Sequence, residues 1–449
     1  MLRDRESADA EALPSAAPAA GVSVGVMGLG YVGLPLAMAS VAAGFDVTGF
    51  DINPARVAAI NAGLQVISYI SAERMQATLA TGRFRAAAEF SRLGACDIVV
   101  ICVPTPLTRH RIPDLSFVEA TARDIAAHLR RGQLVVLEST TWPGTTDEVV
   151  RPILEAAGLK SGTDFFLAYS PEREDPGSER FALSSIPKVV GADDPAALER
   201  ATAYYRRITQ SVVTVSSTRT AEATKLTENI FRSVNIALVN ELKTVYAEMG
   251  IDVWEVIEAA ASKPFGYMPF YPGPGLGGHC IPIDPFYLTW KAREFEVESR
   301  FIELAGQINT RMPHLVIDRL ARALGERGGR GLHGAGILVI GIAYKKNIDD
   351  IRESPALKLM DLILERGGRC DYCDPFVAAI PPTREFRHLA GQAAVALSAE
   401  RVAGYDAVLI ATDHDAIDYD LIARHGRLIV DTRNAFARRG LGGAHIVKA

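Results

Sequence analysis

The sequence predicts an α/β protein with two doubly wound parallel sheets joined by a long central helix. Apolar strand-like runs alternate with helical patterns in the first half of the chain and again after residue 335. Between these parts, residues 220–249 form a helical pattern without an internal glycine or proline. Because 449 residues exceed the capacity of one hydrophobic core, we expect more than one domain.

The composition is typical of a soluble globular protein, with 48% hydrophobic and 22% charged residues. A formal net charge of -5 gives no overall attraction for nucleic acid, and no apolar run is long enough for membrane insertion. Glu6, Asp9 and Glu11 interrupt any secretory signal, so residues 1–20 are expected to be a disordered tail. Five cysteines do not make a disulfide framework, which favours a cytoplasmic protein.

A dinucleotide-binding fingerprint opens the chain after this tail. The apolar run Val22–Met27 is followed by Gly28-Leu-Gly30-Tyr-Val-Gly33, a helical stretch and a second strand that ends at Asp51. Gly28 permits the tight turn, Gly30 the approach of a pyrophosphate, and Gly33 the close packing of helix on strand. Asp51 lies at the distance expected for a partner of the ribose hydroxyls. The first domain is therefore expected to be Rossmann-like and to bind NAD rather than NADP.

Polar loops follow three further apolar strands of this domain. They are Pro104-Thr105-Pro106, the run Ser139–Thr145 and the run Ser170–Gly177, which holds Glu172. Each loop alone is compatible with an ordinary surface turn. Because ligands bind beyond the carboxyl ends of parallel strands, we expect these loops and the glycine turn to border one crevice.

The predicted long helix is a natural connector between domains. Lys225 and Asn229 lie four residues apart on it and therefore share one face. On spacing alone, a solvated polar face is the commoner explanation of such a pair. Further along, a shorter helix is expected from Arg300 to about Thr310, and the Arg- and Gly-rich segment Arg319–Gly334 is expected to be a domain boundary.

The stretch Tyr271–Asp284 is unlike the rest of the chain, because it contains four glycines and three prolines. These residues disfavour both a helix and a central strand, so a shaped loop is expected. Cys280 in such a loop suggests a nucleophile, although a free cysteine more often packs as a small hydrophobe. His279 and the pair Cys370/Cys373 lack the second ligand pair that a zinc site needs, so no metal is assigned.

With these pieces placed, the chain resembles the UDP-glucose/GDP-mannose dehydrogenase family from about Val22 to the C-terminus. The matching motifs are Gly28–Pro35, Pro104–Pro106, Ser139–Thr146, Ser170–Glu172, Lys225–Asn229, Gly277–Cys280 with Asp284, and Gly341–Asp350 with Arg352–Pro355. The resemblance implies an NAD-binding Rossmann domain over residues 21–218 and a central helical dimerisation region over 219–328, which carries the cysteine loop. A UDP-sugar-binding α/β domain is implied over 329–449.

The family's reaction oxidises a sugar C6 hydroxyl to a carboxylate by two hydride transfers to NAD. A thiolate suits this chemistry because it can trap the intermediate aldehyde as a thiohemiacetal, which a second hydride loss converts to a thioester. The resemblance assigns Cys280 as nucleophile and Lys225 and Asn229 as stabilisers of the C6 oxyanion. It assigns Asp284 to orienting water or Lys225, and Thr140 and Glu172 to hydrolysis. Glu174 is a competitor for the role of Glu172.

The resemblance also implies binding residues. Those expected at the cofactor are Gly28, Gly30, Tyr31, Val32, Gly33, Asp51, Arg56, Thr105, Thr140 and Arg352. Those expected at the nucleotide-sugar are Lys225, Tyr271, Gly275, Lys346 and Arg300. Tyr271 is available to stack on uracil, and Arg300 resembles an arginine that reaches a partner subunit's sugar site. A homodimer or higher homo-oligomer is expected, since the family assembles through its central helices.

The position before Asp284 indicates the branch of the family. UDP-glucose dehydrogenases typically carry a lysine there, whereas this chain has Ile283. The loop, together with Ser170–Gly177 and Lys263–Gly275, looks most like the UDP-N-acetyl-D-glucosamine 6-dehydrogenases of bacterial surface-polysaccharide synthesis, including O-antigen and capsule. UDP-N-acetylgalactosamine, UDP-N-acetylmannosamine and UDP-glucose remain alternative substrates.

Overall fold

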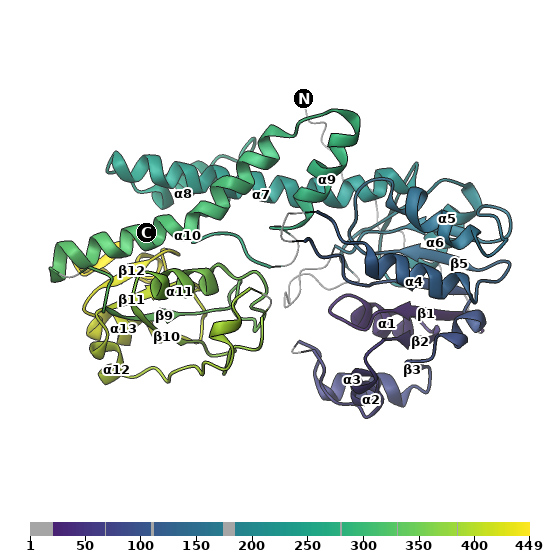
Figure 1. Cartoon of the computed structure of the whole chain (residues 1–449), viewed down its shortest axis with the longest axis horizontal. Coiled ribbons are helices and arrows are strands. Elements are labelled where there is room, and N and C mark those ends of the chain that lie inside the picture. Colours follow the sequence, from purple (N-terminus) through teal and green to yellow (C-terminus); the bar gives the residue numbers. More distant parts are fainter. Residues whose placement is uncertain are drawn as a thin grey trace.

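The computed structural model describes residues 21–449 except residues 68, 109–111, 174–184, 279–280, 330 and 384. The predicted tail, Glu174 and Cys280 thus lie outside the described residues. Two α/β units flank a set of helices, of which α7 (Thr218–Glu248) and α10 (Arg300–Gly328) are the longest. Figure 1 shows both of these helices passing from one unit toward the other, which confirms the predicted fold class.

The first sheet has eight strands in the order β3-β2-β1-β4-β5-β6-β7-β8. All neighbours pair in parallel except β6 and β7. The strands are β1 (Ser23–Met27), β2 (Asp46–Phe50), β3 (Phe84–Ala87), β4 (Ile98–Ile101), β5 (Leu134–Leu137), β6 (Phe166–Tyr169), β7 (Lys188–Ala192) and β8 (Val212–Val215). Because β1 lies between β2 and β4, the glycine turn that follows it sits where the strand order reverses.

Helices cover both faces of this sheet, and a separate apolar core fills each face. Local signals begin two of these helices: the side chains of Asn53 and Asp194 accept backbone hydrogen bonds, and a proline follows each. The helices are α1 (Gly33–Ala42), α2 (Pro54–Asn61), α3 (Ala72–Ala80), α4 (Ser116–Ala126), α5 (Arg151–Glu155) and α6 (Pro195–Arg206), with short turns η1 (Phe90–Ala95) and η2 (Thr146–Val150).

The central helices are α7, α8 (Val253–Ala261), α9 (Asp284–Ala292), the turn η4 (Arg293–Phe295) and α10. The expected end of α10 near Thr310 was wrong, because the helix continues through Pro313 to Gly328. It also occupies the first half of the segment expected to be a boundary. The reason is burial: Val316, Leu320 and their neighbours pack into the core of the second sheet, which outweighs the lost hydrogen bond. Within the described chain, no helix is both long and apolar enough to cross a membrane.

The second sheet has five strands in the order β10-β9-β11-β12-β13, all parallel. Its strands are β9 (Gly336–Ile340), β10 (Arg369–Cys373), β11 (Ala407–Ile410), β12 (Ile429–Asp431) and β13 (Ile446–Lys448). Its helices are α11 (Pro355–Glu365), α12 (Ala399–Gly404) and α13 (Tyr419–His425), with turns η5 (Arg387–Leu389) and η6 (Ala437–Arg439). Cys370 and Cys373 belong to different apolar cores, which fits a strand with incidental cysteines.

The start of α7 packs against the backbone of β7. A Cβ added at Gly191 would lie 2.2 Å from the carbonyl oxygen of Ser217, the residue that caps α7, and 2.8 Å from the Cβ of Ala221. No side chain fits between these elements without a backbone shift. Gly191 therefore allows the central helix to contact the first sheet directly.

We expect Gly191→Ala to lower the free energy of unfolding by about 1–3 kcal/mol, because the new methyl group overpacks this contact. The matched control is Gly325→Ala in α10, where an added Cβ meets nothing within 4 Å. There the better helix propensity of alanine should raise stability by up to about 1 kcal/mol. Urea unfolding followed by circular dichroism measures both, and equal midpoints for the two variants would contradict the prediction.

Candidate active site

The glycine turn after β1 has the shape that a dinucleotide phosphate needs. Gly28 has a φ of +92°, and a Cβ there would lie 2.7 Å from the carbonyl oxygen of Cys102. A Cβ at Gly33 would lie 1.9 Å from the carbonyl oxygen of Gly28. At Gly30, by contrast, an added Cβ meets nothing within 4 Å. Packing therefore requires glycine at Gly28 and Gly33. Gly30 leaves open space at the N-terminus of α1, where a phosphate can approach.

Asp51 is buried at the end of β2 and held by three donors. Its Oδ2 accepts the Leu29 backbone N–H at 3.1 Å and Nη1 of Arg56 at 3.1 Å, and its Oδ1 accepts the Asn53 backbone N–H at 2.9 Å. The carboxylate is therefore fixed beside the glycine turn. This is the position in which an acid can contact ribose hydroxyls.

A cavity of about 430 Å³ joins the predicted cofactor residues. Parts of the glycine turn and of all three polar loops line it, as the expected crevice requires. The predicted residues in its wall are Gly28, Gly30, Tyr31, Val32, Asp51, Arg56, Thr105, Thr140, Glu172 and Arg352. Residues from five separate segments of the first unit therefore surround a space suited to NAD.

Arg352 brings the second unit to this cavity. Its guanidinium lies over the Tyr31 ring at 4.4 Å from the ring centre, a cation–π contact between the two units. Its Nε and Nη2 donate to the Asp350 carboxylate at 3.0 and 2.7 Å, which fixes the side chain. Arg352 thus lines the cavity from the second unit, and its contact with the cofactor stays a prediction.

Lys225 and Asn229 form part of a buried polar cluster on α7. The Lys225 Nζ donates to the backbone oxygen of Glu172 at 2.5 Å and to its Oε2 at 3.2 Å. Asn229 donates from Nδ2 to Oδ2 of Asp284 at 2.5 Å. Both α7 side chains are buried, so the solvated polar face that spacing alone favoured is wrong. The reason is that loops of the first unit and α9 cover this face.

Asp284 begins α9 and is almost fully buried. Burial raises the pKa of its carboxyl to about 7, although the Lys225 charge and the Asn229 hydrogen bond oppose the rise. A carboxyl with such a pKa is partly protonated at neutral pH. It can therefore accept or donate a proton, which is what general acid–base chemistry requires.

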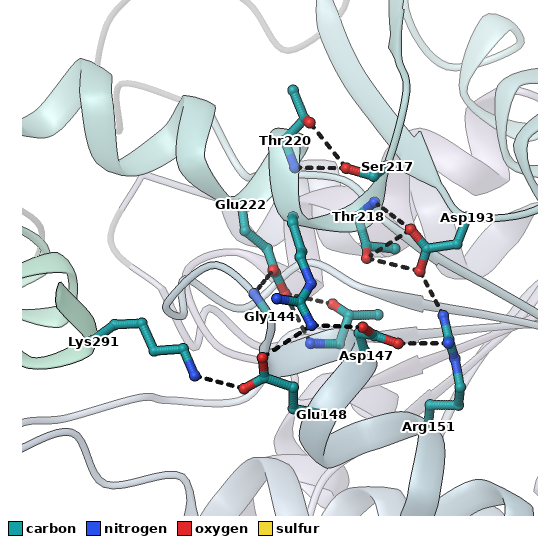
Figure 2. A network of polar contacts seen from close by, with 12 residues as sticks. Gly144, Asp147, Glu148, Arg151, Asp193, Ser217, Thr218, Thr220, Glu222 and Lys291 are labelled. Carbon is teal, nitrogen blue, oxygen red and sulfur yellow. Dashed lines mark hydrogen bonds and ion pairs between the residues drawn. The ribbon is translucent and has the colours of Figure 1, made fainter. Parts of the chain in front are cut away.

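Glu222 lies one turn before Lys225 and holds the loop after β5 against α7. Its Oε2 accepts the Gly144 N–H at 2.5 Å, and its Oε1 accepts the N–H and Oγ1 of Thr146 at 2.9 and 2.7 Å. Figure 2 shows the surrounding charges, with Lys291 of α9 in contact with Glu148 at 2.6 Å. Arg219 donates to the Asp147 carboxylate at 2.8 Å.

This network positions the loop that carries Thr140. Sequence reasoning missed Glu222, although its place three residues before Lys225, on the same helix face, was a usable signal. An acid at that spacing is expected to share the environment of the lysine.

The glycines of the stretch Tyr271–Asp284 serve packing against the second unit. A Cβ at Gly277 would lie 2.6 Å from the Cβ of Tyr344, and one at Gly275 would lie 3.1 Å from the Cβ of Pro355. The Gly278 N–H donates to the Arg352 carbonyl oxygen at 3.0 Å. The loop is thus held against the segment after β9. Cys280, its predicted nucleophile, is two residues after Gly278 in the sequence and lies outside the described residues.

Tyr271 and Arg433 border the start of this loop. Tyr271 is about half exposed and stacks on Trp254, with ring centres 5.9 Å apart, so one ring face stays available. Arg433 follows β12, donates from Nε to Ala411 O at 2.9 Å, and lies 2.6 Å from where a Cβ on Gly273 would be. Sequence reasoning missed Arg433, although the rule about polar turns after parallel strands applies equally to β12.

Two residues predicted to bind the substrate, Lys346 and Arg300, are not brought to the cluster of Lys225 and Asn229 in the same chain. The Lys346 Nζ lies 3.3 Å from the Asp415 carboxylate at the carboxyl end of the second sheet. Arg300, at the start of α10, is 89% exposed and lies 3.8 Å from Glu298. A cavity of about 770 Å³ borders Gly275. Neither Lys225 nor Asn229 lines this cavity, so it does not coincide with the candidate catalytic cluster.

The fold and the first cavity define an NAD-dependent dehydrogenase with a second α/β domain. Comparison with known families makes the assignment narrower. Three models of the UDP-glucose/GDP-mannose dehydrogenase family match the chain: the NAD binding domain at residues 22–209, the central domain at 219–311 and the UDP binding domain at 338–438. The chain belongs to this family, and it is an NAD-dependent nucleotide-sugar dehydrogenase.

Known relatives carry several substrate names. The chain is 37% identical over 368 residues to a UDP-N-acetyl-D-glucosamine 6-dehydrogenase from Pseudomonas aeruginosa, covering 81% of this chain and 85% of that one. It is 35% identical over 432 residues to a UDP-N-acetyl-D-mannosamine dehydrogenase from Pyrococcus horikoshii, covering 93% and 99%. A solved structure of a UDP-D-ManNAc dehydrogenase from Pyrococcus horikoshii matches with a TM-score of 0.85 at 34% identity, over 95% of this chain and 99% of that one.

Because the Glu222 carboxyl is buried, we expect the stability of the folded protein to depend on pH. Burial raises the pKa of Glu222 to about 7, even though hydrogen bonds from Thr146 and Gly144 and the Arg219 charge oppose the rise. Because the pKa of Glu222 is higher in the folded than in the unfolded chain, the folded state keeps the proton up to a higher pH than the unfolded state does. The contribution of this group to stability therefore falls as the pH rises from about 4.3 to about 7.

Relative to Glu222→Gln, the wild type should lose thermal stability as the pH rises from about 5 to about 8. Glutamine cannot ionise, and it keeps an oxygen for the Thr146 donors. Differential scanning calorimetry at several pH values measures the effect. A difference in midpoint between the two proteins that does not change with pH would show that Glu222 does not titrate in this range.

Proposed function

We propose that this protein oxidises the C6 hydroxyl of UDP-N-acetyl-D-glucosamine to the carboxylate of UDP-N-acetyl-D-glucosaminuronate, through a cysteine thiohemiacetal and thioester. The observation that carries the proposal is the buried cluster of Lys225, Glu172, Asn229 and Asp284, because this cluster adjoins the loop that holds Cys280. We place the reaction in the cytoplasm, in the synthesis of a surface polysaccharide.

The mechanism assigns each side chain a chemical task. NAD, when bound, supplies the hydride acceptor for both oxidation steps. Loss of the first hydride from C6, with transfer of the hydroxyl proton to Asp284 directly or through Lys225, gives the aldehyde. The Cys280 thiolate then attacks this aldehyde, a C–S bond forms, and the carbonyl oxygen becomes an oxyanion. Lys225 and Asn229 are the cation and the amide donor that stabilise this oxyanion in a buried site, where such interactions are strong. Loss of the second hydride from C6 gives the thioester.

Hydrolysis of the thioester completes the reaction. Thr140 and Glu172 hold a water molecule for attack on C6, and the C–S bond breaks to release the Cys280 sulfur. Asp284, whose pKa burial raises to about 7, accepts the proton of this water directly or through Lys225. Glu174, outside the described residues, is the alternative to Glu172.

The choice of sugar rests on the loop and on the relatives. Ile283 occupies the position of the lysine that UDP-glucose dehydrogenases typically carry, and it packs into an apolar core beside Tyr287. Relatives named for N-acetylglucosamine and for N-acetylmannosamine are similarly identical to this chain. The backbone of Tyr271–Gly275, the free face of Tyr271 and Lys346 are our candidates for contacting the UDP-sugar.

We also propose a homodimer that is formed through α7 and α10. Phe231, Leu238 and Val245 recur every seventh residue on α7 and are each about half exposed. Phe301 and Leu304 of α10 are also exposed, next to Arg300. An apolar surface of this kind is typical of a protein interface. In the dimer, Arg300 reaches the sugar site of the partner.

Purified protein supplied with UDP-N-acetylglucosamine and excess NAD should form two NADH per sugar. Cys280→Ala should lose this complete turnover, because the aldehyde can no longer be trapped as the thiohemiacetal from which the second hydride leaves. Absorbance at the NADH band and mass spectrometry of the sugar measure both quantities. Cys370→Ala, which changes a buried core thiol of the second sheet, is the matched control. Wild-type stoichiometry in Cys280→Ala would exclude the covalent mechanism.

Initial rates with four sugars test the substrate. UDP-N-acetylglucosamine should give the highest kcat/KM, ahead of UDP-N-acetylgalactosamine, UDP-N-acetylmannosamine and UDP-glucose. A higher value for one of the other three would replace the proposed sugar and leave the mechanism intact.

The proposed dimer predicts complementation between inactive variants. Cys280→Ala and Arg300→Ala should each have low activity alone, and activity should return when the two are unfolded and refolded together. In a mixed dimer, the subunit that keeps Cys280 receives Arg300 from its partner. Light scattering reports the assembly, and Leu238→Glu should shift it toward monomers. If Arg300→Ala has low activity and mixing restores none, Arg300 does not act across the interface.

A further inference from the structure

A third cavity lies apart from the candidate catalytic cluster. It has a volume of about 590 Å³ and is enclosed by the second half of α7, the start of α8, the second half of α10 and β13. None of the predicted cofactor, substrate or catalytic residues lines it. Its charged lining residues are Lys243, Glu248, Asp252, Asp318, Arg319, Arg322, Arg327 and Lys448.

Lys243 is the unusual member of this lining. Its Nζ is buried and has no hydrogen-bond partner among the described residues. The charges that act on it from β12 and the following turn are Asp431 and Arg433, which oppose each other. A buried ammonium without a partner is strongly unfavourable, and an anion in the cavity would remove that penalty.

Two arginines of α10 reinforce the positive charge. Arg319 and Arg322 lie three residues apart and so share a helix face. The two aspartates of the lining are neutralised: Asp252 pairs with Lys448, and Asp318 pairs with Arg366 at 2.7 Å. Glu248 is the other acidic side chain of the lining, and the last residue, Ala449, adds a carboxylate. Four cationic side chains, Lys243, Arg319, Arg322 and Arg327, outnumber these two groups, so the balance of charge is positive and favours an anionic ligand.

We infer that this cavity binds a phosphate-bearing small molecule, with Lys243, Arg319 and Arg322 as its ligands. Guanidinium groups match phosphate geometry with two parallel hydrogen bonds, and the lysine supplies a compact point charge. Met312, Leu315 and Ile251 line the same cavity and offer an apolar surface for the rest of the molecule.

The site contacts the elements that hold the Tyr271–Asp284 loop. Asn240, one turn before Lys243, accepts the Gly273 N–H at 3.0 Å. Trp254 lines the cavity and stacks on Tyr271. Trp254 thus connects the cavity lining to the start of the loop, and Asn240 connects the loop to the same turn of α7 as Lys243. This link to the nucleotide-sugar rests on the proposed function, whereas the binding site itself does not.

Anion binding should weaken as the pH rises. Burial, and then the Arg433 charge, lower the pKa of Lys243 to about 7, against the opposing Asp431 charge. Above that pH the free protein has a neutral Lys243, so binding of an anion must be accompanied by uptake of a proton. Sulfate suits this measurement, because its own charge is constant over the range.

The test uses the full chain without NAD or sugar, so that a failure of the proposed reaction does not affect it. Titration calorimetry with inorganic pyrophosphate should show binding to the wild type, weakened about tenfold or more in Lys243→Met. Lys346→Met is the matched control, because Lys346 lies at the candidate substrate site, and it should keep the binding that depends on Lys243. The sulfate affinity of the wild type should fall from about pH 6.5 to about pH 8.5, a range of about two pH units that spans the pKa of Lys243.

Folding of the variant is checked separately. Lys243→Met removes an unpaired buried ammonium, so its melting temperature in phosphate-free buffer should equal or exceed that of the wild type. If a well-folded Lys243→Met binds pyrophosphate as tightly as the wild type, the inferred site is wrong. Loss of all binding in Lys346→Met would likewise overturn it, because the anion would then occupy the substrate site alone.

Discussion

Burial of the polar face of α7 is the constraint on which the arrangement of this protein depends. Glu222, Lys225 and Asn229 lie on successive turns and are all buried. A buried charge that loses its partner destabilises a protein by about several kcal/mol, and a buried amide without a hydrogen bond is also unfavourable, so each of these side chains requires a fixed partner. The partners come from three separate segments: the loop at Gly144–Thr146, Glu172 after β6, and Asp284 at the start of α9. One helix face thereby sets the relative positions of two loops of the first sheet and the loop that precedes α9.

Local features of the fold could be predicted from the sequence because their causes are local. The glycine turn, β2 at Asp46–Phe50 and most of α7 follow from patterns within a few residues. The length of α10 could not, because Pro313 is a local signal for a helix end, and the burial that overrides it depends on a sheet formed later in the chain. Burial is a property of the assembled core, and residue types alone do not reveal it.

The candidate site shows the same division. Thr105, Thr140 and Glu172 could be placed at one crevice by the rule for parallel strands, and all three line one cavity. The Lys225/Asn229 pair, however, had the spacing of an ordinary solvated face, and only the tertiary packing of Asp284 against it shows otherwise. The glycines before Cys280 predicted a shaped loop, but the contact with Tyr344 that requires Gly277 could not be read from the sequence.

The contact between Arg352 and Tyr31 has a consequence for biosynthesis. The glycine turn emerges from the ribosome early, and the arginine that covers its tyrosine emerges only after the central helices and β9 have been made. A nascent chain that ends before Arg352 lacks part of the wall of the NAD cavity. The complete NAD cavity therefore requires a chain that includes Arg352. In a fragment that contains the fingerprint alone, the cavity is open on the side that Arg352 lines.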